Sequence, residues 1–131
     1  MSAFAHGPAW GRQMGRIAAL AIPGVLEGHA DRGGGRAMLV LSGELDRGGA
    51  GLVGRAVATL LAEPTPRLVI DLRDLTFIDL AGVRELLAAR TRAGARAMGM
   101  SVLVRPGAVL RLLRLLESEE RLGVRTVPRA A

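Results

Sequence analysis

Short apolar runs alternate with helix-period stretches along most of this chain, and turn residues separate them. The run Arg67–Asp71 (RLVID) is continuous and of strand length, as expected for a strand buried on both faces of a sheet. Between residues 52 and 61, apolar residues instead recur at helical spacing, and Pro64 and Pro66 follow them. Two alternating periods of this kind predict an α/β domain, with mostly parallel strands joined by right-handed helical crossovers.

The predicted order of elements is β-β-α-β-α-β-α-β. Residues 25–30 and 36–41 form an opening hairpin, because the glycines of DRGGG between them suit a tight turn. The later predicted elements are a helix at 80–93 with Gly94 as C-cap, a strand at 99–104, a helix at 108–116 and a strand at 124–127. We therefore expect a mixed, mostly parallel sheet of four to five strands, with three to four helices on one or both faces.

Residues 1–24 differ in composition from the remainder of the chain. They contain no acidic residue and two of the three aromatic residues, Phe4 and Trp10. We interpret this segment as a flexible N-terminal leader, with a docked functional arm as the alternative. Since the leader lacks a periodic apolar face, a chain without residues 1–22 is expected to fold. The domain itself is predicted over residues 25–127, followed by a tail at 128–131.

Several residue types that support catalysis are missing from the 131 residues. Without Cys there are no disulfides, thiolate nucleophiles or Cys-based zinc sites, and without Lys there is no P-loop lysine or Schiff base. Neither His6 nor His29 has a nucleophile spaced near it, and no hydroxyl residue stands in a G-x-S-x-G motif. The sequence thus contains no recognisable catalytic set, and we expect no cofactor and no metal.

The net charge of +6 is concentrated in residues 81–131, which hold ten Arg and four acidic residues. No aromatic residue lies among these arginines to stack on bases, so we expect solvated helix faces and no nucleic-acid binding. The longest apolar run, around Ala18–Ile22, is far shorter than a membrane span or a signal peptide requires. We expect a cytoplasmic protein without membrane insertion.

Four aspartates lie near the ends of predicted strands: Asp46, Asp71, Asp74 and Asp79. Carboxylates at the carboxyl edge of an α/β sheet can hold a metal or a nucleotide, or act as acid and base. However, Asp71 and Asp74 straddle a predicted turn, and Asp79 is placed to cap the next helix. Turn and capping roles are favoured, and a small nucleotide- or metal-binding enzyme is kept as an alternative.

Three strings in register resemble one family: LSGELD at 41–46, LVIDLRDLTFIDLAGV at 68–83 and SVLVRPGAVLRLLRLL at 101–116. Together they are similar to the STAS domain family of bacterial anti-sigma factor antagonists, over about residues 25–127. The resemblance implies a non-enzymatic protein-interaction module that acts in transcription regulation by partner switching. It would bind an anti-sigma factor with a serine/threonine kinase fold and so release a sigma factor, until phosphorylation by that kinase ends the binding.

The resemblance also implies where phosphorylation would occur. The family's acceptor is a Ser or Thr two residues after the Asp of an F-x-D motif, which here is Phe77–Asp79. The acceptor position is Ala81, and Gly82 matches the glycine that follows the acceptor. Because alanine has no hydroxyl, phosphate cannot be accepted at this position, and Thr76 is the nearest hydroxyl. Binding is then constitutive, or regulation has moved elsewhere, or the module serves a different partner.

The same predicted helix indicates a partner surface. If its inward side holds Val83, Leu87, Arg90 and Gly94, its outward stripe consists of Ala81, Glu85, Ala88 and Arg92. The candidate surface is completed by residues around the helix start and by one residue from the loop after the second strand: Thr76, Asp79, Leu80, Gly82 and Asp46. An ordinary solvated face is the simpler interpretation of this stripe. A subunit of a lipid-transport or transporter complex is the alternative function within the same fold.

Overall fold

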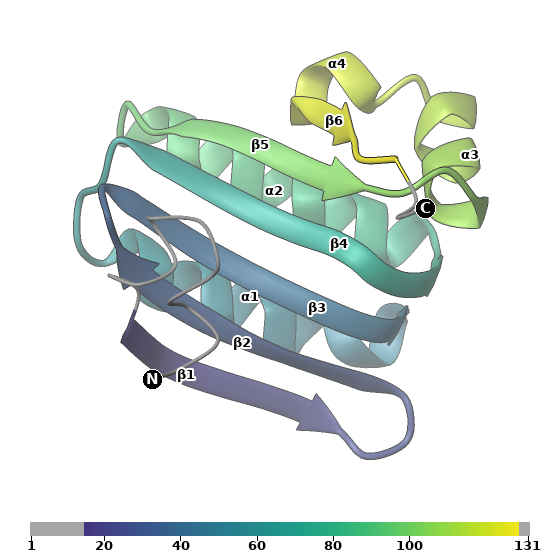
Figure 1. Cartoon of the computed structure of the whole chain (residues 1–131), viewed down its shortest axis with the longest axis horizontal. Helices are drawn as coiled ribbons and strands as arrows, with labels where there is room; N and C mark the ends of the chain where they lie inside the picture. Colours follow the sequence, from purple (N-terminus) through teal and green to yellow (C-terminus); the bar gives the residue numbers. More distant parts are fainter. Residues whose placement is uncertain (1–14, 129–131) are drawn as a thin grey trace.

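The computed structural model describes residues 15–128 and contains one six-stranded sheet in the order β1-β2-β3-β4-β5-β6 (Figure 1). The strands are β1 (Gly15–Ile22), β2 (Leu26–Gly33), β3 (Arg36–Leu45), β4 (Arg67–Ile78), β5 (Gly99–Val104) and β6 (Val124–Thr126). The helices are α1 (Arg47–Leu61), α2 (Leu80–Ala95), α3 (Ala108–Leu115) and α4 (Glu119–Leu122). The predicted α/β class with a mostly parallel sheet is confirmed, although the sheet has more strands than predicted.

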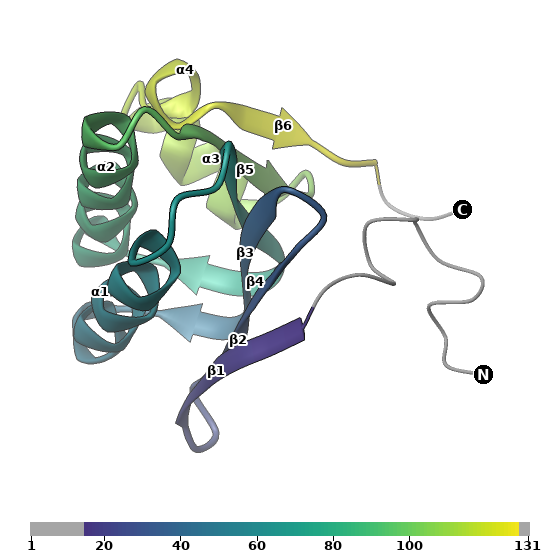
Figure 2. The ribbon, with the colours of Figure 1, turned by 90° about the vertical axis from the view of Figure 1, so that its left-hand side faces the viewer.

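The helices lie on one face of the sheet. The first two strand pairs are antiparallel, and the pairs from β3 to β6 are parallel and joined through helices. Helices α1 and α2 lie side by side against this face (Figure 2), and Leu113 of α3 and Leu122 of α4 join the same core. The opposite face, called here the open face, carries no helix among the residues that the structure describes.

The core is built by apolar spacing that is visible in the sequence. Helix α1 buries Val53, Ala56, Val57, Leu60 and Leu61, as the spacing between residues 52 and 61 predicts. These side chains pack on those of the central strands that face the helices, including Leu39, Ile70 and Val102. The predicted bounds of β5 are also confirmed, because a short apolar run between Gly99 and Arg105 leaves little choice of register.

The predicted leader is wrong for residues 15–22, which form the edge strand β1. This strand pairs antiparallel with β2, and Ala18, Leu20 and Ile22 pack against the core. Gly24 has a φ of +74° in the tight turn between the two strands, a conformation that glycine adopts without strain. The strand was missed because its alternation is carried mainly by alanine and leucine, which do not favour strands strongly. Residues 1–14 and 129–131 of the predicted leader and tail lie outside the described residues.

Strand β4 continues through the segment that was predicted as a turn. It runs from Arg67 to Ile78, and its pairing with β3 shifts register between Val40 and Ser42 and again between Gly43 and Glu44. Such bulges allow paired strands to bend and continue. The interpretation that Asp71 and Asp74 straddle a turn is therefore wrong, since both lie within the strand.

Removing residues 1–22 is expected to destabilise the domain, contrary to the expectation from the sequence. The truncation removes β1 and uncovers core side chains that Leu20 and Ile22 contact, a loss of about 2 to 4 kcal/mol in the free energy of unfolding. The melting temperature of the chain without residues 1–22 should be compared with that of a chain starting at Gly15. The two chains differ by β1 alone, so the difference measures what this strand contributes. Equal melting temperatures would contradict the role assigned to this strand.

Candidate functional site

The starts of α1 and α2 lie next to each other at one edge of the sheet. Asp46 is the N-cap of α1 and accepts a hydrogen bond from the Gly48 N–H, at 2.9 Å. Asp79 is the N-cap of α2 and accepts from the Gly82 N–H, also at 2.9 Å. The Asp79 N–H in turn donates to the Leu45 carbonyl at 3.2 Å, which joins the two junctions. Asp46 thus lies at the same edge as the predicted site on α2, and the capping role predicted for Asp79 is observed.

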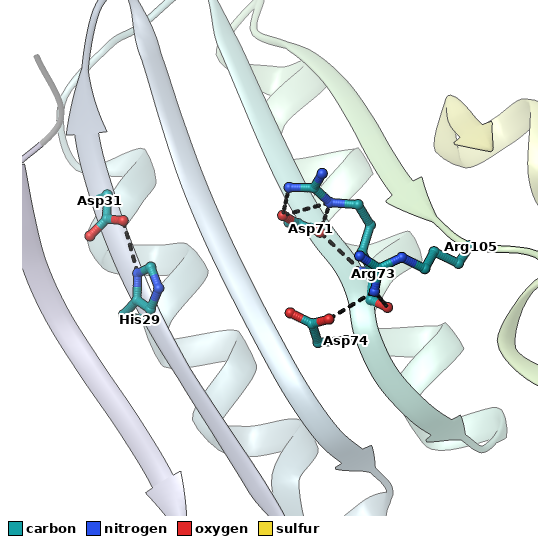
Figure 3. Close-up of polar contacts among 6 residues, drawn as sticks. All are labelled: His29, Asp31, Asp71, Arg73, Asp74 and Arg105. Carbon is teal, nitrogen blue, oxygen red and sulfur yellow. Dashed lines mark hydrogen bonds and ion pairs between the residues drawn. The ribbon is translucent and has the colours of Figure 1, made fainter. Parts of the chain in front are cut away.

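The other two aspartates are held by arginines (Figure 3). Arg73 donates from Nε to both carboxylate oxygens of Asp71, at 3.0 and 3.2 Å, and from Nη2 at 2.7 Å. This hydrogen bonding raises the pKa of Arg73, although partial burial of its guanidinium acts in the opposite direction. Arg105 donates to Asp74 and to the Arg73 carbonyl, both at 2.9 Å, and so ties the loop before α3 to β4.

All four carboxylates considered for a metal or nucleotide site are thus engaged in caps or ion pairs. Within residues 15–128, no three His, Asp or Glu side chains gather as metal ligands. His29 lies on the open face, where its Nδ1 is 2.8 Å from an oxygen of Asp31 (Figure 3). The four aspartates therefore have structural roles in this fold, and their contacts do not bring them together in one site.

Gly82 is required by the packing of the helix start. A Cβ at this position would lie 2.7 Å from Cγ1 of Ile78 and 3.0 Å from Cγ and the carbonyl oxygen of Leu45. Backbone and rigid core atoms cannot move away as a flexible surface side chain can. The glycine therefore lets α2 begin directly against the ends of β3 and β4, whatever its role toward a partner.

Two large apolar side chains that precede Ala81 in the sequence are exposed. Phe77 is 45% exposed at the end of β4, and Leu80 is 49% exposed at the start of α2, while Ala81 itself is half-buried. Phe77 faces outward because the next residue, Ile78, is buried in the core. We call Phe77, Leu80 and Ala81 the junction surface. Phe77 was not among the predicted site residues, although strand alternation next to Ile78 gave a signal for its exposure.

Thr76 lies beside this surface, but its hydroxyl is engaged. Its Oγ1 donates to the Gly43 carbonyl of the neighbouring strand, at 3.0 Å, and the residue is exposed. A cavity of about 460 Å³ opens next to it, between the end of β4 and the loop that leads into α3, with Arg105 and Gly107 on its far side. Thr76, Asp79, Leu80, Ala81 and Gly82 are thus grouped within one strand end and one helical turn.

The predicted outward stripe of α2 is only partly outward. The helix buries Gly82, Val83, Leu86, Ala89 and Ala93. Of the predicted stripe, Ala88 is exposed, whereas Ala81, Glu85 and Arg92 are half-buried. Arg92 approaches α1, where its Nη2 donates to the Gly54 carbonyl at 3.4 Å, and its Nη1 is 4.0 Å from Glu85.

The predicted inward side is wrong for Arg90 and Gly94, which are exposed. Arg90 donates from Nε to the Arg121 carbonyl at 2.9 Å, so this side of α2 faces α4. The helix also continues to Ala95 with Arg96 as its C-cap, and Gly94 is not the cap. The rotation differs from the prediction because α2 packs against α1 and α4 as well as the sheet, which a single apolar spacing does not reveal.

No helix among residues 15–128 is long and apolar enough to cross a membrane. The strand-to-helix junction exposes the ring of Phe77 and the side chain of Leu80, and the small residue Ala81 follows them in the first turn of α2. Exposed apolar side chains that gather on a rigid element are typical of protein contact sites.

Comparison with known proteins supports the same fold and family. The family model described as "Mlab, STAS domain" matches residues 29–127. The structure is similar to that of an anti-sigma factor antagonist from Mycobacterium paratuberculosis, with a TM-score of 0.71 and 26% identity over 80% of this chain and 89% of that one. No curated protein sequence shows significant similarity.

Two further solved structures share the fold at lower identity. The anti-sigma factor antagonist SpoIIAA in its unphosphorylated form has a TM-score of 0.61 and 14% identity, over 86% of this chain and 87% of that one. SiaC from Pseudomonas aeruginosa, in its apo form, has a TM-score of 0.55 and 17% identity, over 87% of this chain and all of that one. Because the family model covers most of the described sheet and all four helices, this chain belongs to the STAS domain family.

Proposed function

We propose that this protein is a non-enzymatic anti-sigma factor antagonist. It binds an anti-sigma factor with a serine/threonine kinase fold through the junction surface, and this binding releases a sigma factor. The observation that carries the proposal is the exposure of Phe77 and Leu80 in the segment that leads to Ala81, the position that corresponds to the family's acceptor. The similarity to an antagonist at 26% identity supports the class of partner.

The chemistry of the junction surface suits a protein partner. Phe77 and Leu80 supply apolar area that a partner can desolvate, and the small Ala81 allows the partner to approach the start of α2 closely. Asp46 and Asp79 fix the two helix starts through their caps, and Gly82 keeps α2 against the sheet. We assign these three residues to positioning the surface and expect direct contacts from the apolar side chains.

Beyond the first turn of α2, fewer residues can contact a partner than the sequence suggests. Ala88 is exposed two turns after Ala81 and can extend the contact along the helix. Glu85 and Arg92 are half-buried toward α1, so we propose that they support the α1–α2 packing and meet a partner only at their exposed atoms. The surface is therefore centred on the helix start.

Because Ala81 has no hydroxyl, we expect that phosphorylation at this position does not regulate partner binding. A kinase cannot place phosphate there, so the charge that would repel a partner at this surface does not arise. Thr76 is a poor substitute, because its hydroxyl is already bonded to Gly43 within the sheet. We propose that the protein stays competent to bind whether or not its partner is active as a kinase.

Affinity purification with the full chain separates this function from the alternative within the same fold. Recovery of a kinase-fold anti-sigma factor supports the proposal, and recovery of a transport ATPase supports a subunit of a lipid-transport or transporter complex. The enzyme alternative receives no support from the structure, because Asp46, Asp71, Asp74 and Asp79 are all engaged.

Ala81→Asp is expected to fold normally and to weaken binding of the recovered anti-sigma factor by at least about tenfold. A carboxylate in the first turn of a helix is stabilising by about 0.3 to 1 kcal/mol, so the melting temperature should hold or rise slightly. In a contact surface the same charge must lose its water without a waiting cation. Titration calorimetry gives the affinity, and Ala81→Ser is the control that should bind like the parent. Full affinity of the Asp variant would rule out this helix start as the contact.

Phe77→Ala and Leu80→Ala should each weaken binding of the same partner by about 1 to 2 kcal/mol, since buried apolar anchors dominate contact energies. Both side chains are half exposed, so the effect on the free energy of unfolding should be smaller than this. Leu115→Ala is a matched control, because Leu115 is 77% exposed on α3, outside the junction surface. If the control reduces affinity as much as the two variants, the contact lies elsewhere.

Thr76 is expected to remain unphosphorylated when the chain is incubated with the recovered kinase-fold partner and ATP. Transfer would require the hydroxyl to leave its hydrogen bond with Gly43 at the end of a paired strand. Intact-mass and peptide mass spectrometry measure the outcome, with Thr76→Val as the variant that cannot accept phosphate. Stoichiometric phosphate on Thr76 would show that the switch has moved, and that binding is not constitutive.

A further inference from the structure

The open face of the sheet carries apolar side chains at its centre. Met38, Val69 and Leu103 come from three adjacent strands, β3, β4 and β5, and point away from the helices. A sheet face without a covering layer usually shows polar residues at such alternate positions, whereas Met38 and Val69 are apolar and only 5% and 7% exposed. The apolar character of β4 predicts a strand buried on both faces of the sheet. However, no helix covers the open face in the described part of the chain (Figure 2).

Arginines stand around these apolar side chains. Arg67 at the start of β4 and Arg125 of β6 line the same cavity of about 390 Å³, with Arg36 in register beside Arg67. Nη1 of Arg67 donates to the hydroxyl of Ser101 at 3.3 Å, which holds the guanidinium at the cavity wall. Neither Arg67 nor Arg125 forms an ion pair with any carboxylate between residues 15 and 128.

Three carboxylates of the open face, those of Asp31, Asp71 and Asp74, form ion pairs with other residues. Asp71 is held by Arg73, and Asp74 is held by Arg105 (Figure 3). Asp31 lies 2.8 Å from His29 and 3.5 Å from Arg16, at the far side of the sheet. The charges of Arg67 and Arg125 therefore have no ion-pair partner among the described residues, although the floor of the cavity is apolar.

We propose that this cavity binds a small amphiphilic anion. The apolar tail of the ligand lies on Met38, Val69 and Leu103, and its carboxylate or phosphate head is bound by Arg67 and Arg125. Guanidinium groups bind both kinds of head through paired, charge-assisted hydrogen bonds. The volume falls within the range of small-molecule sites, which are mostly apolar with a few polar groups that fix orientation.

This site is separate from the junction surface. It lies on the open face toward the starts of β3 and β4, whereas Phe77 and Leu80 lie where β4 ends and α2 begins. The inference therefore does not rest on the proposed antagonist function, and either one can fail without the other.

The test uses the full chain with octanoate and octyl phosphate as probes, followed by titration calorimetry and by NMR of methyl groups. We expect one or both probes to bind and to shift the methyl signals of Met38, Val69 and Leu103. Acetate, inorganic phosphate and 1-octanol each carry only half of the ligand, and should bind at least about tenfold more weakly. Preference for one of the two heads identifies whether a carboxylate or a phosphate is the natural group.

The double variant Arg67→Gln, Arg125→Gln should weaken binding of the preferred probe by at least about tenfold. Arg111→Gln is the matched control, because Arg111 is an exposed arginine on α3, outside the cavity, and should bind the probe like the parent. The melting temperature of each variant shows whether a loss of probe affinity reflects unfolding of the domain.

Four results would overturn the proposal: no shift of the three methyl signals with either probe, equal binding of 1-octanol, equal binding of acetate or inorganic phosphate alone, or unchanged affinity in the double variant. Equal loss in Arg111→Gln would also overturn it, since binding would then follow net charge. If the three signals respond only to a protein partner, the open face is a macromolecular contact and the ligand assignment is wrong.

Discussion

The parallel pairing of β3 with β4 extends to the last residues of both strands, where Leu45 lies opposite Ile78, and each strand passes directly into a helix. The hydrogen bond from the Asp79 N–H to the Leu45 carbonyl closes this pairing and places the two helix starts together. The remainder of the junction depends on it. Only while β4 stays in register to its end does Ile78 enter the core and Phe77 face outward.

Strand β4 connects the two surfaces inferred for this protein. Its first residues contribute Arg67 and Val69 to the cavity of the open face, and its last residues lead to the junction surface. Between them, Asp71 and Arg73 hold each other, and Arg105 fixes the loop before α3 to the same strand. These contacts satisfy the polar groups in the middle of this central strand. The start of β4 can therefore contribute to an anion site while its end contributes to an apolar contact surface.

Features that depend on nearby residues could be predicted from the sequence, and features that depend on distant neighbours could not. The buried face of α1 and the cap at Asp79 follow from local spacing and local hydrogen bonding. The continuation of β4 depends on register shifts relative to β3, and the rotation of α2 depends on α1 and α4. Strand β1 depends on pairing with β2, because its own alanine-rich sequence is weakly patterned. For the site, the helix start was predictable from the family motif, whereas the burial of Glu85 and Arg92 required the neighbouring helix.

Phe77 is the sole aromatic residue between residues 15 and 128, so the core is packed entirely by aliphatic side chains and methionine. The described domain therefore contains no tryptophan or tyrosine that could fluoresce. A tryptophan introduced in place of Phe77 would put an indole at the junction surface while leaving every core contact in place. Its emission would report directly on the water around that one position, and the only other indole in the chain would be that of Trp10.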